Sequence, residues 1–130
     1  MQAIICAHYG DTNSLSLQET AAPTLKPGHL LIDNYASSVN PIDWKIRSGQ
    51  LKLITGLRRP PAILGSDFAG IIKEMATPHP TLAVGDRVYG FVNPRHGGAY
   101  ATQLIAPTDN VALIPDSLSF TQAATLPVAA

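Results

Sequence analysis

One segment of the chain decides its fold: Val39-Asn-Pro-Ile-Asp-Trp-Lys-Ile-Arg-Ser-Gly49. Asn40 is a favourable N-cap residue, and Pro41 suits the first position of a helix, where a missing backbone N–H costs nothing. The segment follows His29–Val39, which reads as a long strand with Leu31, Asp33 and Tyr35 on one face. We therefore expect a short helix over Asn40–Arg47, directly after a strand.

The rest of the chain is divided into short pieces by 11 prolines and 10 glycines, which favours strands and turns over long helices. A second helix is predicted over Ser119–Ala130, because Ser119 and Gln122 form a Ser-x-x-Gln capping box; Pro127 should bend or end it. Further strands are predicted over Ala3–His8, Leu15–Glu19, Ala69–Met75, Asp86–Val92, Tyr100–Ala106 and Val111–Ile114. This pattern is typical of a mainly β barrel or sandwich.

The composition argues against several classes of partner. Nine basic and nine acidic residues cancel, and no run of like charge stands out, so we expect neither nucleic acid nor a membrane as a partner. No apolar stretch approaches the roughly 18 residues that span a bilayer, and Met1–Ala7 lacks the basic start of a signal peptide. The single cysteine, Cys6, rules out an intrachain disulfide and fits a reducing compartment, so a cytoplasmic location is expected.

Motifs for metal, nucleotide and hydrolase chemistry are incomplete. Only Cys6 and His8 have the spacing of metal ligands, and two ligands do not make a closed site. Gly65-Ser-Asp-Phe-Ala-Gly70 has the outer glycines of a phosphate loop, but Ile71-Ile72 replaces the required Lys and Ser/Thr, and no Gly-x-Gly-x-x-Gly occurs. Neither Ser48 nor Ser66 stands in a nucleophile elbow. The sequence predicts no metal site here.

Five motifs in order carry a family resemblance. The chain resembles the N-terminal domain of the quinone oxidoreductases, a zinc-independent branch of the medium-chain dehydrogenase/reductase superfamily. The first motif is the Val39–Gly49 segment, and four others follow it: Pro61-Ala-Ile-Leu-Gly-Ser-Asp-Phe-Ala-Gly70, Val84-Gly-Asp-Arg-Val-Tyr-Gly90, Gly97-Gly-Ala-Tyr-Ala101 and Ala123-Ala-Thr-Leu-Pro127. The resemblance covers nearly the whole chain.

The resemblance implies a GroES-like, partly open β-barrel with one or two short helices. Residues 1–118 correspond to that domain, and residues 119–130 to the start of a helix that leads into a dinucleotide-binding domain beyond this chain. In zinc-dependent relatives a cysteine ligand stands at the position of Asn40 and a histidine ligand at that of Ser66. An amide and a hydroxyl do not replace these ligands on Zn²⁺, so no zinc is expected.

The implied function is hydride transfer from NADPH to a quinone or an α,β-unsaturated carbonyl. Such chemistry needs the acceptor oriented against the nicotinamide and its developing charge stabilised. By this resemblance Asn40 and Asp43 are candidate catalytic and cofactor-binding residues, and Lys45 is a further catalytic candidate. The dinucleotide-binding domain would hold most of the cofactor, so these 130 residues are expected to be inactive alone, and the full-length protein to be a homodimer.

Each of these residues also has a purely structural interpretation. Asn40 can cap its helix while lining the cleft, Asp43 can interact with the helix dipole, and Lys45 can be a solvated helical lysine. Trp44, Leu51 and Arg58 are expected at the substrate cleft, with Lys52 and Arg59 flanking the same loop as cations. For Asp67 we expect a structural ion pair.

A non-catalytic module is the alternative function. A GroES-like barrel can act in interaction or oligomerisation through a mobile loop with an apolar binding tripeptide. Leu51–Leu57 is apolar enough to serve as such a loop. The Asn-Pro-Ile-Asp-Trp-Lys segment has no part in that function, and it therefore favours the oxidoreductase.

Overall fold

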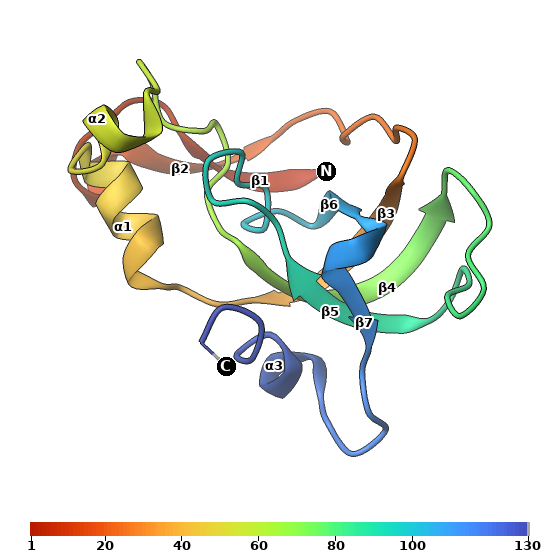
Figure 1. The fold of residues 1–130 in the computed structure, drawn as a ribbon. Coiled ribbons are helices and arrows are strands. Elements are labelled where there is room, and N and C mark those ends of the chain that lie inside the picture. The colour runs from red at the N-terminus through yellow and green to blue at the C-terminus, as the bar shows by residue number, and fades with distance from the viewer. Residues whose placement is uncertain (130) are drawn as a thin grey trace.

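The computed structural model describes residues 1–129, which form two antiparallel sheets and three short helices (Figure 1). The small sheet pairs β1 (Gln2–Cys6) with β2 (Leu15–Glu19). The larger sheet has the order β6-β3-β4-β5-β7 and consists of β3 (His29–Ser37), β4 (Asp67–Met75), β5 (Arg87–Phe91), β6 (Gln103–Pro107) and β7 (Val111–Leu113). The helices are α1 (Pro41–Ser48), α2 (Lys52–Thr55) and α3 (Phe120–Ala123).

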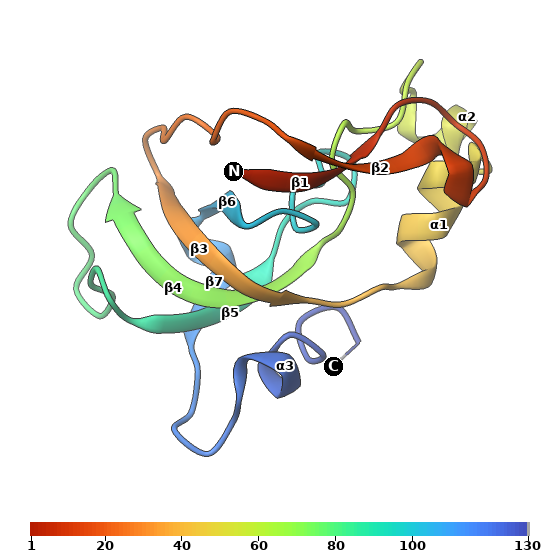
Figure 2. The ribbon, with the colours of Figure 1, turned by 180° about the vertical axis from the view of Figure 1, so that it is seen from behind.

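The predicted mainly β, GroES-like fold is confirmed. The larger sheet curls around the core, but its end strands β6 and β7 do not pair, so the barrel is only partly closed (Figures 1 and 2). The strand β1 lies across the open side, where the Ile4 N–H donates to the Tyr100 carbonyl at 2.8 Å and the Cys6 N–H to the Ala62 carbonyl at 2.7 Å. Because residues 100–102 pair with β1, the strand predicted from Tyr100 begins at Gln103 instead.

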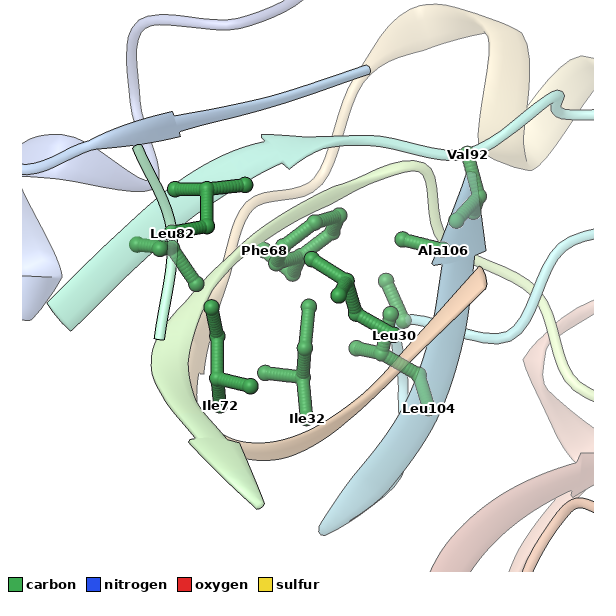
Figure 3. Packing of buried hydrophobic residues seen from close by; sticks show 10 residues of the cluster. Leu30, Ile32, Phe68, Ile72, Leu82, Val92, Leu104 and Ala106 are labelled. Carbon is green, nitrogen blue, oxygen red and sulfur yellow. The ribbon is translucent and has the colours of Figure 1, made fainter. Parts of the chain in front are cut away.

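The core is built from residues that alternate along β3, β4 and β6, because successive side chains of a strand point to opposite faces. Figure 3 shows side chains from these strands converging around Phe68, which is fully buried. Their partners in this cluster include Leu30, Ile32, Ile72, Leu104 and Ala106. On β3 the core face is therefore that of Leu30 and Ile32, opposite the face of Leu31, Asp33 and Tyr35.

The helix after β3 is confirmed, and it ends at Gly49, whose φ of 87° is the left-handed conformation that glycine adopts without strain. The helix predicted over Ser119–Ala130 is wrong in length, because α3 covers only Phe120–Ala123; Ala130 lies outside the described residues. Its capping box is present, but a residue before proline is disfavoured in the α conformation, which stops the helix short of Leu126-Pro127. None of the helices in residues 1–129 is both long and apolar enough to cross a bilayer.

The pairing of β3 with β4 depends on the absence of a side chain at Gly70. Gly70 pairs with Asn34, and a Cβ at this position would overlap the carbonyl oxygen of Asp33. Backbone atoms of a central strand pair cannot move aside as a flexible side chain can. The position therefore requires glycine for close approach and not for an unusual φ.

We predict that Gly70→Ala lowers the free energy of unfolding by about 1–3 kcal/mol, the usual cost of overpacking. Urea unfolding followed by circular dichroism measures the effect. Lys73→Ala, on an exposed position of the same strand, is the control and should unfold like the wild type. An equally stable Gly70→Ala variant would contradict the proposed steric limit.

Candidate functional site

The candidate site lies at the start of α1, around the buried carboxylate of Asp67. Asp67 is the first residue of β4 and is 0% exposed. Its Oδ2 accepts hydrogen bonds from the Ser38 hydroxyl at 2.6 Å and from Asn40 Nδ2 at 2.9 Å, and its Oδ1 accepts one from the Val128 N–H at 3.0 Å. The predicted ion pair of Asp67 is wrong, since no basic side chain within residues 1–129 forms one with it. Three neutral donors stabilise the charge instead.

The side chain of Asn40 has its orientation set by Asp67. An ionised carboxylate only accepts hydrogen bonds, so the amide must turn its NH₂ group toward Asp67. Asn40 is half-buried and occupies the N-cap position of α1, where it and Asp43 form a capping box. The Asn40 N–H donates to the Asp43 carboxylate, and the Asn40 side chain faces the Asp43 N–H without a regular hydrogen bond to it. Asp67 therefore fixes the NH₂ group of Asn40, while the amide oxygen is turned toward the first turn of α1.

Asp43 connects the start of α1 to the segment before β6. It is 3% exposed, and its Oδ2 accepts the Asn40 N–H at 2.8 Å and the Tyr100 hydroxyl at 3.0 Å. Burial raises the pKa of the Asp43 carboxyl above its ordinary value of 3.8, although the hydrogen bonds from Asn40 and Tyr100 oppose this effect. Burial, followed by the nearby Asp43 charge, also raises the pKa of Tyr100, so its hydroxyl remains a donor.

Tyr100, like Ser38 and Val128, is a residue of this site that the sequence pattern did not single out. It stands inside the quoted motif Gly97-Gly-Ala-Tyr-Ala101, which was the only signal for it. The tyrosine packs closely against Gly65, where a Cβ would lie 2.5 Å from its ring. Asp43 and Tyr100 thus form a pair that joins α1 to the opposite side of the barrel.

Lys45 and Trp44 lie on α1 but are not part of the Asp67 group, that is, Asp67 and the residues that donate to it (Ser38, Asn40 and Val128). The Lys45 ammonium is 5.6 Å from the centroid of the Trp44 ring, within the range of a cation–π contact. Neither Asp43 nor Asp67 forms an ion pair with Lys45 in residues 1–129. Trp44 is 42% exposed and lines an apolar cavity of about 180 Å³ together with Leu15, Val39, Asp43, Leu64 and Tyr100. The structure thus places Trp44 and Asp43 against one small cavity.

Leu51 and Arg58 flank α2, and Figure 1 shows α2 at the C-terminal end of α1, away from the end that follows Asn40. Leu51 packs against Cys6, Ile46 and Leu64, whereas Arg58 is exposed on the loop after α2. Eight helical residues separate the two ends by roughly 12 Å. The structure therefore brings together Asn40, Asp43 and Trp44 but not Leu51 or Arg58.

We predict a pH-dependent stability difference between the wild type and Asp43→Asn. Because the folded chain holds the Asp43 proton more tightly than the unfolded chain, this group stabilises the fold fully below pH 3.8 and less as the pH rises through the raised pKa. The free energy of unfolding of the wild type, relative to Asp43→Asn, should fall over that window and then level off. Urea unfolding at a series of pH values measures it. Asp116→Asn, at an exposed carboxylate, serves as control; a difference that rises with pH would contradict the prediction.

We also predict that Asp67→Asn lowers the free energy of unfolding by about 2–4 kcal/mol, since hydrogen bonds to a charged group contribute about 1.5–3 kcal/mol each and an amide cannot accept all three donors in the same way. Ser38→Ala removes one donor and should cost less. Thermal and urea unfolding measure both variants. Equal stability of Asp67→Asn and the wild type would show that the carboxylate does not stabilise the three segments.

Comparisons with known proteins agree with this architecture. Residues 26–116 match the family model described as the alcohol dehydrogenase GroES-like domain. A quinone-oxidoreductase homologue of Spinacia oleracea is 35% identical over 100% of this chain and 40% of its own length, and an NADPH-dependent alkenal/one oxidoreductase of Arabidopsis thaliana is 31% identical over 99% of this chain and 35% of its own. The structure of the quinone oxidoreductase from Coxiella burnetii superposes with a TM-score of 0.87 at 35% identity, over 99% of this chain and 41% of that one.

These relatives are oxidoreductases, and the chain spans only 35–41% of their length. The matched family model extends from the turn before β3 to the residues after β7, and so contains the whole Asp67 group apart from Val128. The chain belongs to the alcohol dehydrogenase GroES-like domain family, among the quinone oxidoreductases and their medium-chain dehydrogenase/reductase relatives.

Proposed function

We propose that this chain is the substrate-side domain of an NADPH-dependent reductase of quinones or α,β-unsaturated carbonyls. The observation that carries the proposal is the fixed orientation of Asn40, whose amide NH₂ group is held by the buried Asp67 carboxylate at the start of α1. The relatives named as a quinone-oxidoreductase homologue and an NADPH-dependent alkenal/one oxidoreductase support the substrate and cofactor classes. NADPH, when bound, supplies the hydride.

In this proposal Asn40 orients the cofactor and the acceptor through hydrogen bonds of its side-chain amide. Its Oδ1 can accept from the carboxamide NH₂ of a nicotinamide or from the hydroxyl of a reduced product. The second N–H of Nδ2 remains for a carbonyl oxygen. A group held rigidly by a buried carboxylate loses little freedom when a ligand binds, which favours precise orientation.

Asp43 and Tyr100 have a supporting role. Their hydrogen bond holds the first turn of α1 against the barrel, and so keeps Asn40 in place at the start of the helix and Trp44 beside the apolar cavity. Apolar walls with a few fixed polar groups are typical of sites for small organic molecules. Lys45 lies one residue beyond Trp44 and supplies positive charge to the same helix.

The reaction is proposed to proceed without zinc, because the residues at the ligand positions do not fit the metal. The nitrogen of Asn40 is engaged with Asp67, and the hydroxyl of Ser66 is fully buried without a partner. Zinc in proteins takes sulfur, imidazole nitrogen or carboxylate oxygen, and the Asp67 carboxylate already accepts three hydrogen bonds. No step is assigned to a metal.

We further propose that the longer protein has one domain for the substrate and another for the cofactor, as the relatives suggest. Residues 1–118 form the substrate-side domain, and the segment from 119 onward leads toward a nucleotide-binding domain that holds most of the cofactor. The chain alone is proposed to be inactive, and the longer protein to be a homodimer. The alternative function, a non-catalytic interaction module, is favoured by one observation, the high exposure of Leu53 and Ile54 in the predicted binding loop.

The test is NADPH oxidation with benzoquinone or a small enone, measured for the chain alone and for a fusion to the nucleotide-binding part of the Coxiella burnetii relative. We expect turnover only in the fusion, and a fall in kcat/KM of about tenfold to a hundredfold in Asn40→Ala, the value of one or two hydrogen bonds. Asn13→Ala, at an exposed asparagine in the turn before β2, is the control.

A folded fusion that binds NADPH but reduces neither acceptor would contradict the proposed reaction. A fusion that is active and unaffected by Asn40→Ala would contradict the assigned role of Asn40 alone. The two results are distinguishable because the first concerns the wild type.

A further inference from the structure

The charges of this chain are strongly segregated although they sum to zero. Residues 44–66 contain no acidic side chain but hold five of the nine basic ones, namely Lys45, Arg47, Lys52, Arg58 and Arg59. A sixth, Arg95, joins them in space, because its guanidinium lies 3.8 Å from the position that a Cβ on Gly56 would take. The net charge of zero therefore does not reflect the local excess of positive charge around α2.

The same region exposes the two least covered large aliphatic side chains of the described residues. Leu53 is 100% exposed and Ile54 is 82% exposed, side by side on α2. In both views α2 lies at the end of α1 away from α3 and the C-terminal segment (Figures 1 and 2). Together they form an exposed apolar patch that is available for a contact outside this domain.

The segment that carries α2 is held in place by contacts with the rest of the domain. Leu51, just before the helix, packs into the cluster of Cys6, Ile46 and Leu64. The Tyr9 hydroxyl donates to the Leu57 carbonyl at 2.8 Å, and the Lys52 ammonium lies 5.2 Å from the Tyr9 ring centroid. The two aliphatic side chains therefore project from a supported turn.

The shape of the region selects the kind of partner. The cavity beside Trp44 reaches Arg47 but is lined by none of residues 49–62. An exposed aliphatic pair within a basic stretch of chain fits the surface of an anionic bilayer, where aliphatic side chains enter the acyl boundary and cations contact lipid phosphates.

We propose that the α2 tip, defined as Leu53 and Ile54 with Lys52, Arg58 and Arg59, binds the surface of membranes that contain anionic phospholipids. The proposal is independent of the reductase function and differs from the expectation based on net charge, because it depends on where the charges lie. The contact is peripheral: two side chains enter the interface and the barrel stays in water.

The experiment is co-sedimentation of the 130-residue chain with vesicles of phosphatidylcholine mixed with phosphatidylglycerol, and with vesicles of phosphatidylcholine alone. We expect binding to the mixed vesicles that weakens with added salt, and much weaker binding to the neutral ones. The double variant Leu53→Ser/Ile54→Ser should bind at least about tenfold more weakly. Each of Arg58→Gln and Arg59→Gln should cost about fivefold, the effect of one cation near an anionic surface.

Matched controls change the same chemistry elsewhere. Leu17→Ser replaces a leucine that is 65% exposed on β2, and Lys73→Gln an exposed cation on β4; both should bind like the wild type. The variants alter exposed side chains, and circular dichroism verifies that they fold.

Four outcomes would overturn the proposal. The wild type fails to sediment with mixed vesicles, or the tip variants bind as well as the controls. Alternatively, the chain forms a dimer without lipid that Leu53→Ser/Ile54→Ser abolishes, which would assign the tip to a second copy. Binding of inorganic pyrophosphate that depends on Arg58 and Arg59, without vesicle binding, would assign the cations to a free phosphate ligand and likewise overturn it.

Discussion

The arrangement of this domain depends on one buried negative charge. The carboxylate of Asp67 lies at the start of a central strand, where it is fully removed from water. A charge in that position is tolerated only when hydrogen-bond donors surround it. Ser38, Asn40 and the backbone of Val128 supply them from two segments far apart in the sequence. The chain between β3 and α1 and the chain after α3 are therefore both fixed by the need to solvate one side chain.

A second carboxylate, that of Asp43, fixes the backbone at the start of α1. It accepts from the backbone of Asn40 and from Tyr100, and so fixes the first turn of α1 relative to the barrel. Asn40 is thereby held twice, through its backbone by Asp43 and through its side chain by Asp67. The backbone contact is half of a capping box between Asn40 and Asp43, and the contact with Asp67 uses the amide NH₂ group, which capping does not need.

Sequence patterns predicted the elements better than the contacts of the site. The strand before α1, the helix itself and the capping box of α3 were predictable, because alternation, Asn40-Pro41 and Ser119-x-x-Gln122 act locally. The helix α3 ends before Pro127, which was predicted to bend or end it, but it is shorter than the predicted range. The pairing of Asp43 with Tyr100 was not predictable, because it joins residues 57 positions apart. The helix α2 escaped notice because Leu51 provides no cap and its apolar residues face outward.

The hydrogen bond from Val128 to Asp67 has a mechanical consequence. The segment that leaves α3 and the amide of Asn40 share one carboxylate, so each reduces the charge available to the other. A displacement of that segment strong enough to break its bond would concentrate the negative charge on the oxygen facing Asn40 and tighten that contact. The position of the segment after α3 and the strength of the hydrogen bond to the Asn40 amide are thus linked, because both groups donate to the Asp67 carboxylate.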